Sequence, residues 1–227
     1  MITSFRPSAA ERLLGLFFPP RCLLCDQVVP VGQLFCPPCR ARLPEDFRRR
    51  SLTLEDGGIL PVASVLVYEE GFRKTLHQLK FRGQKGLARP IALLMAQAAG
   101  TYEEAFACVA YVSMYPGDRR RRGFDHSRLL AKYTAAKLGL PLSDALVKVR
   151  KTKTQHKLDA GERQKNLRGA YQCREDMTGR AVLLVDDIVT TGGSLAECAR
   201  ALKEAGAARV CALCAADTPL RPKNLYL

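Results

Sequence analysis

The chain has 227 residues, of which 47% are hydrophobic, and it carries a formal net charge of +14. This hydrophobic content is enough for a buried core, so the composition excludes an intrinsically disordered chain. No apolar run approaches the ~20 residues that a bilayer-spanning helix needs, and we expect no transmembrane segment.

The first 60 residues predict a small cysteine module followed by a linker. They contain seven prolines and little helical or strand periodicity. Four thiolates suit a tetrahedral Zn²⁺, and so short a segment has no large core of its own. We therefore predict a module over residues 1–60 with a structural zinc site formed by two C-x2-C pairs, Cys22 with Cys25 and Cys36 with Cys39.

The cysteines also indicate a reducing compartment. A redox C-x2-C pair is the alternative to zinc, but such a site begins a helix inside a β-α-β unit, which this segment lacks. The stretch LLGLFFPP is no signal peptide, since Glu11 and Arg12 precede it and no small-residue cleavage site follows. We expect a cytoplasmic protein whose other cysteines include four core residues, Cys108, Cys198, Cys211 and Cys214.

From residue 61 onward, apolar strand patterns alternate with helical patterns. Alternation of this kind is typical of a parallel sheet with helices on its faces, so we predict one α/β domain over residues 61–227. Strands are expected at 61–68, 107–113, 181–185 and 209–215, and helices at 72–80, 86–99, 126–138 and 194–205.

The positive charge is concentrated in one stretch of the chain. In residues 119–168, Lys and Arg outnumber Asp and Glu by 11. Such a concentration of positive charge favours binding of a polyanionic partner, either nucleic acid or a phosphorylated small molecule. A basic, solvated surface that aids solubility is an equally common alternative.

The sequence VLLVDDIVTTGGSL predicts a ligand site at the carboxyl edge of the sheet, where open α/β sheets bind ligands. A buried strand at 181–185 leads into Asp186 and Asp187. A ribose diol can donate one hydrogen bond to each carboxylate, and a nearby Mg²⁺ would offset the repulsion between them.

The loop after the carboxylates, Thr190, Thr191, Gly192, Gly193 and Ser194, runs into a predicted helix. Backbone N–H groups at a helix start, with glycines that permit close approach, form a phosphate cradle. The sequence lacks the nucleotide-binding motifs G-x4-G-K-[ST] and G-x-G-x-x-G. Carboxylates and cradle together predict a ribose 5-phosphate ligand, and the alternative is a purely structural turn.

This stretch resembles the signature with which type I phosphoribosyltransferases bind 5-phosphoribosyl 1-pyrophosphate (PRPP). Four further blocks precede this stretch in the chain: CLLC…CPPC, LKFRGQKGLA (79–88), RRRRGFDHS (119–127) and KTQHKLDAGERQKNLRGAY (153–171). With its blocks in this order, the chain resembles the ComF family of competence proteins. The resemblance implies a type I phosphoribosyltransferase fold behind a zinc module, with PRPP and Mg²⁺ as ligands. It also implies a role in natural transformation at the cytoplasmic face of the membrane, with single-stranded DNA and a competence helicase or other DNA-uptake proteins as partners.

By this resemblance, Asp186 and Asp187 contact the ribose and residues 190–194 bind the 5′-phosphate. The chain departs from relatives that have Pro-Val-Pro where it has residues 111–113, and Asn-Gln where it has residues 125–126. The candidates for contacts with pyrophosphate or nucleic-acid phosphate are Lys80, Arg82, Ser113 and Arg122.

Few other side chains suggest chemistry. None of the three histidines, His77, His126 and His156, has a neighbouring Asp or Cys that would suggest a triad, so we expect surface or hydrogen-bonded roles. Three phenylalanines beside basic residues are candidates for base stacking or for the core: Phe72, Phe81 and Phe124.

Three functions therefore remain open. The first is a competence protein that handles single-stranded DNA, with PRPP as ligand or regulator. The second is an active phosphoribosyltransferase of nucleotide salvage or biosynthesis, and the third is a PRPP-responsive regulatory or scaffold protein. The cysteine module and the order of the family blocks favour the first. No catalytic residue and no nucleobase pocket is identified, so transfer activity stays open.

Overall fold

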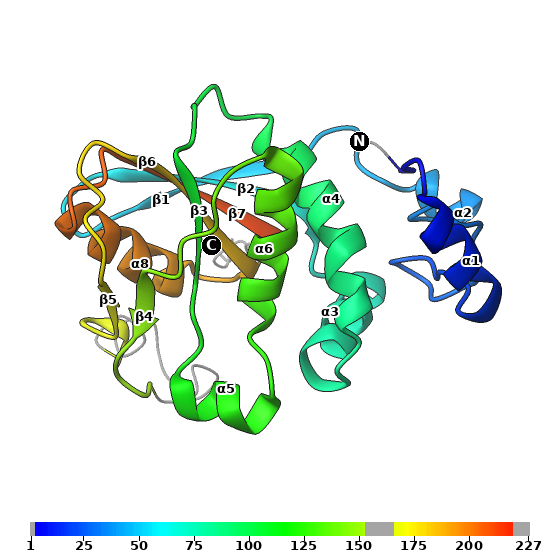
Figure 1. Cartoon of the computed structure of the whole chain (residues 1–227). Helices are drawn as coiled ribbons and strands as arrows, with labels where there is room; N and C mark the ends of the chain where they lie inside the picture. The colour runs from blue at the N-terminus through cyan, green and yellow to red at the C-terminus, as the bar shows by residue number, and fades with distance from the viewer. Residues whose placement is uncertain (1–2, 153–165, 220–227) are drawn as a thin grey trace, which may run out of the picture.

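The computed structural model describes residues 3–152 and 166–219. Figure 1 shows a central sheet with helices on both faces and a small N-terminal module at one side. The strands are β1 (Arg48–Thr53), β2 (Ile59–Val67), β3 (Cys108–Tyr111), β4 (Leu146–Lys148), β5 (Tyr171–Cys173), β6 (Ala181–Val189) and β7 (Arg209–Asp217). The helices are α1 (Ala9–Phe17), α2 (Pro37–Arg40), α3 (Glu70–Phe81), the 3₁₀ helix η1 (Lys85–Leu87), α4 (Ala88–Ala99), α5 (Pro116–Arg122), α6 (His126–Leu138) and α8 (Gly193–Glu204).

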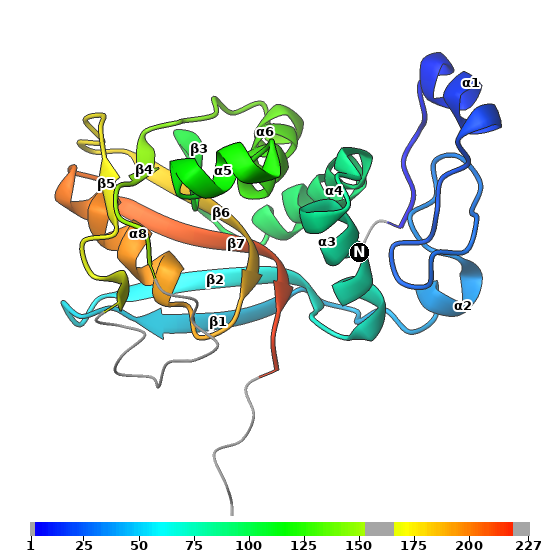
Figure 2. The ribbon, with the colours of Figure 1, turned by 90° about the horizontal axis from the view of Figure 1, so that it is seen from below.

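The main sheet has five strands in the order β1-β2-β7-β6-β3. The β2–β7, β7–β6 and β6–β3 pairs are parallel, and only β1 runs antiparallel to its neighbour. Figure 2 shows the strands side by side, with β4 and β5 forming a separate antiparallel pair near α8. The predicted α/β architecture with a mostly parallel sheet is confirmed.

The core has two layers because side chains alternate across the sheet. On β6, Leu183 and Val185 join the cluster on the α4 and α6 face, while Val182 and Leu184 join the cluster on the α8 face. Strands buried on both faces read as continuous apolar runs, which explains why they were visible in the sequence. The four cysteines predicted to be core residues, Cys108, Cys198, Cys211 and Cys214, are all buried.

Several elements differ from the sequence expectations. The predicted linker contains β1, whose RRRSLT sequence resembles a charge run because it forms a sheet edge, where charged side chains are usual. Strands β4 and β5 have three residues each, too short to leave a periodic pattern. Strand β6 was expected to end at Val185 but runs to Val189. Within the described ranges, no helix is long and apolar enough to cross a membrane.

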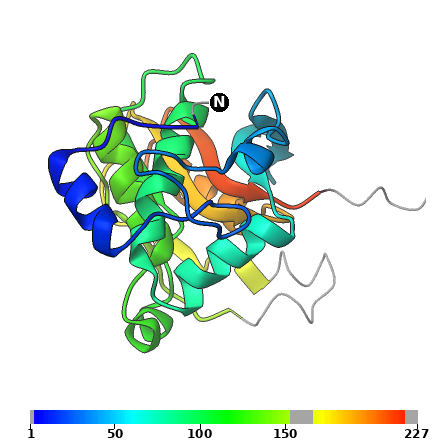
Figure 3. The same ribbon diagram turned by 90° about the vertical axis from the view of Figure 1, so that its right-hand side faces the viewer.

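The cysteine module packs directly against the α/β domain. Figure 3 shows it lying over α3 and α4. The Thr75 hydroxyl donates a 2.7 Å hydrogen bond to the Leu23 carbonyl, and Leu23 and Phe35 belong to the same buried cluster as Phe72 and Leu76. Because the core is shared, the module stabilises α3, which carries part of the candidate site.

Candidate functional site

Asp186 and Asp187 lie where the neighbouring strand β3 ends. The last β3–β6 pair is Tyr111 with Val185, whereas β6 continues to pair with β7 as far as Val189. The two carboxylates therefore sit at the carboxyl end of β3, but they lie inside β6 and not after a strand that ends at Val185, as the sequence predicted. Both are buried, with 9% and 5% of their surface exposed.

Asp187 is held by two helices on the same face. Its Oδ2 forms an ion pair with the Lys80 ammonium from α3, and it lies 3.2 Å from His126 Nε2 of α6. Arg122 Nη1 lies 3.0 Å from His126 Nδ1. Because arginine only donates, Nδ1 accepts this hydrogen bond, and the ring proton of a neutral His126 is on Nε2, the nitrogen that lies 3.2 Å from Asp187 Oδ2. Burial, with Lys80 and Arg122 nearby, holds the pKa of His126 well below its usual range, so the ring is neutral.

Asp186 has a different environment. Its Oδ1 accepts hydrogen bonds from the Ser127 hydroxyl at 3.0 Å and from the Asp187 backbone N–H at 2.8 Å. Burial raises the pKa of Asp186 to about 7, although Lys80 and Ser127 act in the opposite direction. The site therefore holds one carboxylate that is ion-paired and another whose charge is costly until a cation or a hydrogen-bond donor arrives.

The loop after β6 leaves the start of α8 open. The residue before the helix, Gly192, has φ 83°, and no side chain caps the first helical N–H groups. The positive φ favours glycine there, and a Cβ at this position would also force the Leu52 side chain, 2.3 Å away, to shift. Arg50 Nη2 donates a 2.8 Å hydrogen bond to the Thr190 carbonyl and fixes the loop from β1. The arrangement matches a phosphate cradle formed by backbone N–H groups.

The predicted phosphate contacts are only partly brought together. Lys80 forms an ion pair with Asp187. Arg122 does not contact a carboxylate directly but interacts with His126, which lies next to Asp187. Arg82 lies at the exposed end of α3. Ser113 is buried, and its hydroxyl accepts a 3.0 Å hydrogen bond from the Lys148 backbone N–H.

The sequence interpretation missed two residues of this site. His126 was treated as an isolated histidine, but it contacts Asp187 from a helix that begins 61 residues earlier. Ser127, 59 residues from Asp186, was not singled out. The one available signal was three successive polar residues, Asp125 to Ser127, at the start of a helix that faces the strand end. His156 and residues 153–165 of the fourth family block lie outside the described residues.

Helix α5 presents a basic surface. Helix α5 exposes Arg119, Arg120 and Arg121 beside a cavity of about 720 Å³. Of the three candidate aromatic residues, Phe72 is buried, whereas Phe81 is 61% exposed with the Arg122 guanidinium 4.8 Å from its ring centroid.

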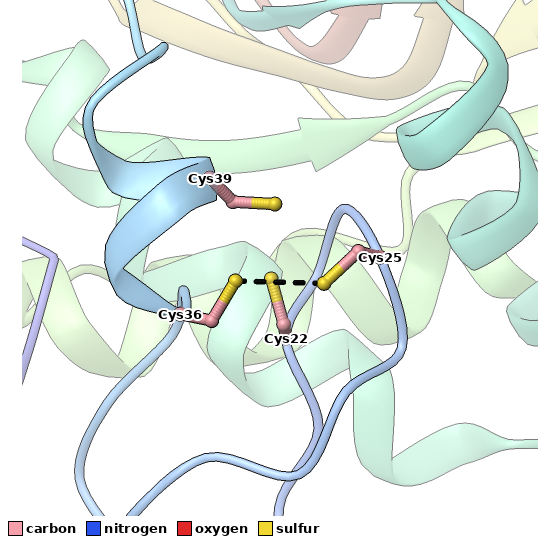
Figure 4. A group of neighbouring side chains, drawn as sticks. All are labelled: Cys22, Cys25, Cys36 and Cys39. Carbon is pink, nitrogen blue, oxygen red and sulfur yellow. Dashed lines mark hydrogen bonds between the residues drawn. The ribbon is translucent and has the colours of Figure 1, made fainter.

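The four cysteines of the N-terminal module form a compact cluster. Their sulfur atoms all lie within 4.8 Å of one another, and Figure 4 shows the side chains pointing toward a common centre. Zinc bound at ~2.3 Å from each of four sulfurs requires such spacing. Burial raises the pKa of Cys22, but backbone hydrogen bonds from Cys36, Leu24 and Cys25 outweigh it and lower the pKa to about 7. The cluster fits a tetrahedral zinc site.

Comparison with known proteins finds two family matches in the chain. Residues 13–50 match the double zinc ribbon domain family, and residues 125–226 match the phosphoribosyl transferase domain family. A DNA utilization protein YhgH of Salmonella typhi is 33% identical over 163 residues, covering 69% of this chain and 72% of the relative. Competence protein F of Haemophilus influenzae is 30% identical over 148 residues, covering 61% and 65%. A purine phosphoribosyltransferase structure from Pyrococcus horikoshii aligns with a TM-score of 0.37 at 17% identity, covering 70% of this chain and 83% of that one.

Proposed function

The chain belongs to the ComF family of phosphoribosyltransferase-domain proteins with an N-terminal zinc ribbon, and we propose that it binds PRPP with Mg²⁺ and handles single-stranded DNA in its uptake or utilization. The observation that carries the proposal is the pairing of two buried carboxylates with an uncapped helix start at one strand end. These features recognise the two ends of a ribose 5-phosphate.

In the proposed complex, Asp186 and Asp187 accept hydrogen bonds from the ribose hydroxyls. The backbone N–H groups of residues 192–194 donate to the 5′-phosphate, where the positive end of the α8 dipole adds to the attraction. Arg50 keeps this loop in place through the Thr190 carbonyl. Burial lowers the pKa of Lys80 to about 8. When the ribose hydroxyls bind Asp187, the Lys80 ammonium can leave its ion pair with Asp187 and contact the pyrophosphate.

The carboxylates also fit a magnesium ion, since Mg²⁺ prefers oxygen ligands and one or two carboxylates with substrate phosphates. Asp186 and Asp187 would hold it, and the ion would neutralise charge on the pyrophosphate. The raised pKa of Asp186, which results from burial, supports this assignment because a bound cation stabilises the charged form.

We assign the DNA contacts to α5 and the end of α3. Three exposed arginines, Arg119, Arg120 and Arg121, supply positive charge for the phosphates. The exposed ring of Phe81, next to Arg122, offers a surface on which a base can stack. The names of the relatives, DNA utilization protein and competence protein, support this part of the proposal. We further propose a cytoplasmic location, where the four cysteines stay reduced and hold one structural zinc ion.

The test is calorimetric titration of the zinc-loaded protein with PRPP and Mg²⁺, then with single-stranded DNA. We expect saturable binding of both. Release of pyrophosphate in the presence of a panel of bases would establish transfer activity as well. Absence of PRPP binding would overturn the assignment of the carboxylate site, and absence of DNA binding would overturn the role in DNA handling.

A further inference from the structure

Lys148, at the end of β4, was not singled out by the sequence. It pairs with Tyr171 of β5 in the antiparallel register, and its Nζ lies 5.3 Å from the centroid of the Tyr171 ring. The Lys148 backbone N–H donates to the Ser113 hydroxyl at 3.0 Å. The strand carrying Lys148 is thus fixed at two points, one on β5 and one on the segment that follows β3.

The ammonium group lies between the two parts of the ligand site. Tyr171 is 3% exposed, and its hydroxyl lies beside the side chain of Ser194, the second residue of α8. Lys148 also interacts electrostatically with Asp186 of β6 and with the buried Cys198 of α8. Figure 2 shows β4 and β5 lying next to α8. The ammonium therefore lies over the ring of Tyr171, whose hydroxyl neighbours Ser194 in the first turn of α8.

Lys148 differs from two other basic residues near the site, Lys80 and Arg128, in having no salt-bridge partner among the described residues. Lys80 pairs with Asp187, and Arg128 pairs with Asp144. Among the described residues, no carboxylate forms a salt bridge or hydrogen bond with Lys148, whose ammonium contacts a ring face. Burial lowers the pKa of Lys148, which indicates that its charge is partly desolvated. A partly desolvated cation that forms no direct salt bridge favours binding of an anion.

We propose that Lys148 is a ligand-binding residue whose ammonium contacts the phosphate held at the start of α8. The inference rests on the proposed function and adds a side-chain contact to a cradle otherwise made of backbone N–H groups. Because the ammonium lies toward Tyr171 and Ser194, we assign it to the 5′-phosphate rather than to the pyrophosphate. Ser113 then acts as a positioning residue, since its hydroxyl fixes the backbone of Lys148.

The experiment compares the zinc-loaded parent protein with Lys148→Met, using ribose 5-phosphate, pyrophosphate and PRPP with Mg²⁺ as separate calorimetric probes. Methionine keeps the length of the aliphatic chain, so the strand pair retains its packing. Loss of one charge-assisted hydrogen bond weakens binding about tenfold to a hundredfold. Lys132→Met, an exposed lysine on α6, is the matched control for net charge.

We expect weaker binding of ribose 5-phosphate and PRPP by Lys148→Met, unchanged binding of pyrophosphate, and partial recovery in Lys148→Arg. Selective loss of pyrophosphate affinity would overturn the assignment to the 5′-phosphate. Equal PRPP affinity in parent and Lys148→Met would overturn the inference while leaving the proposed function intact. A parent protein that binds none of the three probes would overturn the proposed function itself.

Discussion

Arg50 of the edge strand β1 donates a 2.8 Å hydrogen bond to the carbonyl oxygen of Thr190, across β2 and β7. The same guanidinium lies 3.2 Å from Asp217, which is 4% exposed at the end of β7. The edge strand thus connects the loop after β6, which we propose binds the 5′-phosphate, to a buried carboxylate, and this connection gives the first prediction.

Arg50→Met should release the loop and leave Asp217 buried without this cation. We expect PRPP affinity to fall about tenfold. We expect the free energy of unfolding to fall by less than the ~3 kcal/mol cost of breaking an isolated buried pair, because Arg48 still lies 3.9 Å from Asp217. Calorimetry and chemical denaturation measure the two effects. Arg49→Met, one residue away on the opposite side of the strand, is the control. Unchanged PRPP affinity in Arg50→Met would contradict the positioning role.

Asp186 predicts an unusual pH dependence of stability. Burial raises its folded pKa to about 7, against about 3.9 in an unfolded chain. The folded state therefore binds more protons between these values. The stabilisation that results is complete below about pH 4 and is lost as the pH rises toward 7.

Asp186→Asn removes this titration. In ligand-free protein, the unfolding free energy of the variant should fall less between pH 5 and 8 than that of the parent, by roughly 2 kcal/mol. Denaturant midpoints across this range measure it. Asp176→Asn is the control, because the hydrogen bonds from Thr178 lower the pKa of Asp176 and place its titration below this range. Parallel pH profiles for parent and Asp186→Asn would show that burial does not shift Asp186.

The cysteine cluster predicts one bound zinc ion per chain. Replacing Cys22 and Cys25 with Ser should release about one zinc equivalent. It should also lower the unfolding temperature, because Leu23 and Phe35 share a core with Phe72 of α3. Metal analysis and thermal unfolding test both effects, with Cys173→Ser, outside the cluster, as control. A variant with the metal content of the parent would contradict the zinc site.

The exposed arginines of α5 predict salt-dependent DNA binding. Removing two phosphate contacts with Arg119→Ala and Arg120→Ala should weaken binding uniformly across sequences. It should reduce the slope of log affinity against log salt by about 1.4, since each contact contributes about 0.7 for single strands. Lys132→Ala with Lys137→Ala removes the same charge from α6 and should change the slope less. If both double variants behave alike, only net charge matters and α5 is no specific contact surface.

The sequence predicted β6, α8 and the loop between them because their signals are local. A buried apolar run, two adjacent carboxylates and two glycines stand within 14 residues, and each restricts the backbone directly. The resemblance to a family added the order of the blocks. The cysteine cluster was visible for the same reason, since two short pairs determine its geometry.

The remaining site residues depend on contacts between distant parts of the chain. His126 and Ser127 meet the carboxylates only because α6 packs beside β6. Lys148 reaches α8 through a three-residue strand that leaves no pattern. Arg50 lies in the charged stretch RRRSLT, which the sequence interpretation assigned to a linker. Tertiary packing, which a single sequence does not display, determines all four positions.

Replacing both strand-end carboxylates, in Asp186→Asn with Asp187→Asn, tests the central claim most directly. The measurement is calorimetric titration with PRPP and Mg²⁺, alongside the parent and Asp176→Asn, with circular dichroism to show that the fold is retained. We predict that the parent and Asp176→Asn bind PRPP, while the double variant folds and shows no measurable binding. A folded double variant with the PRPP affinity of the parent would contradict the carboxylate site.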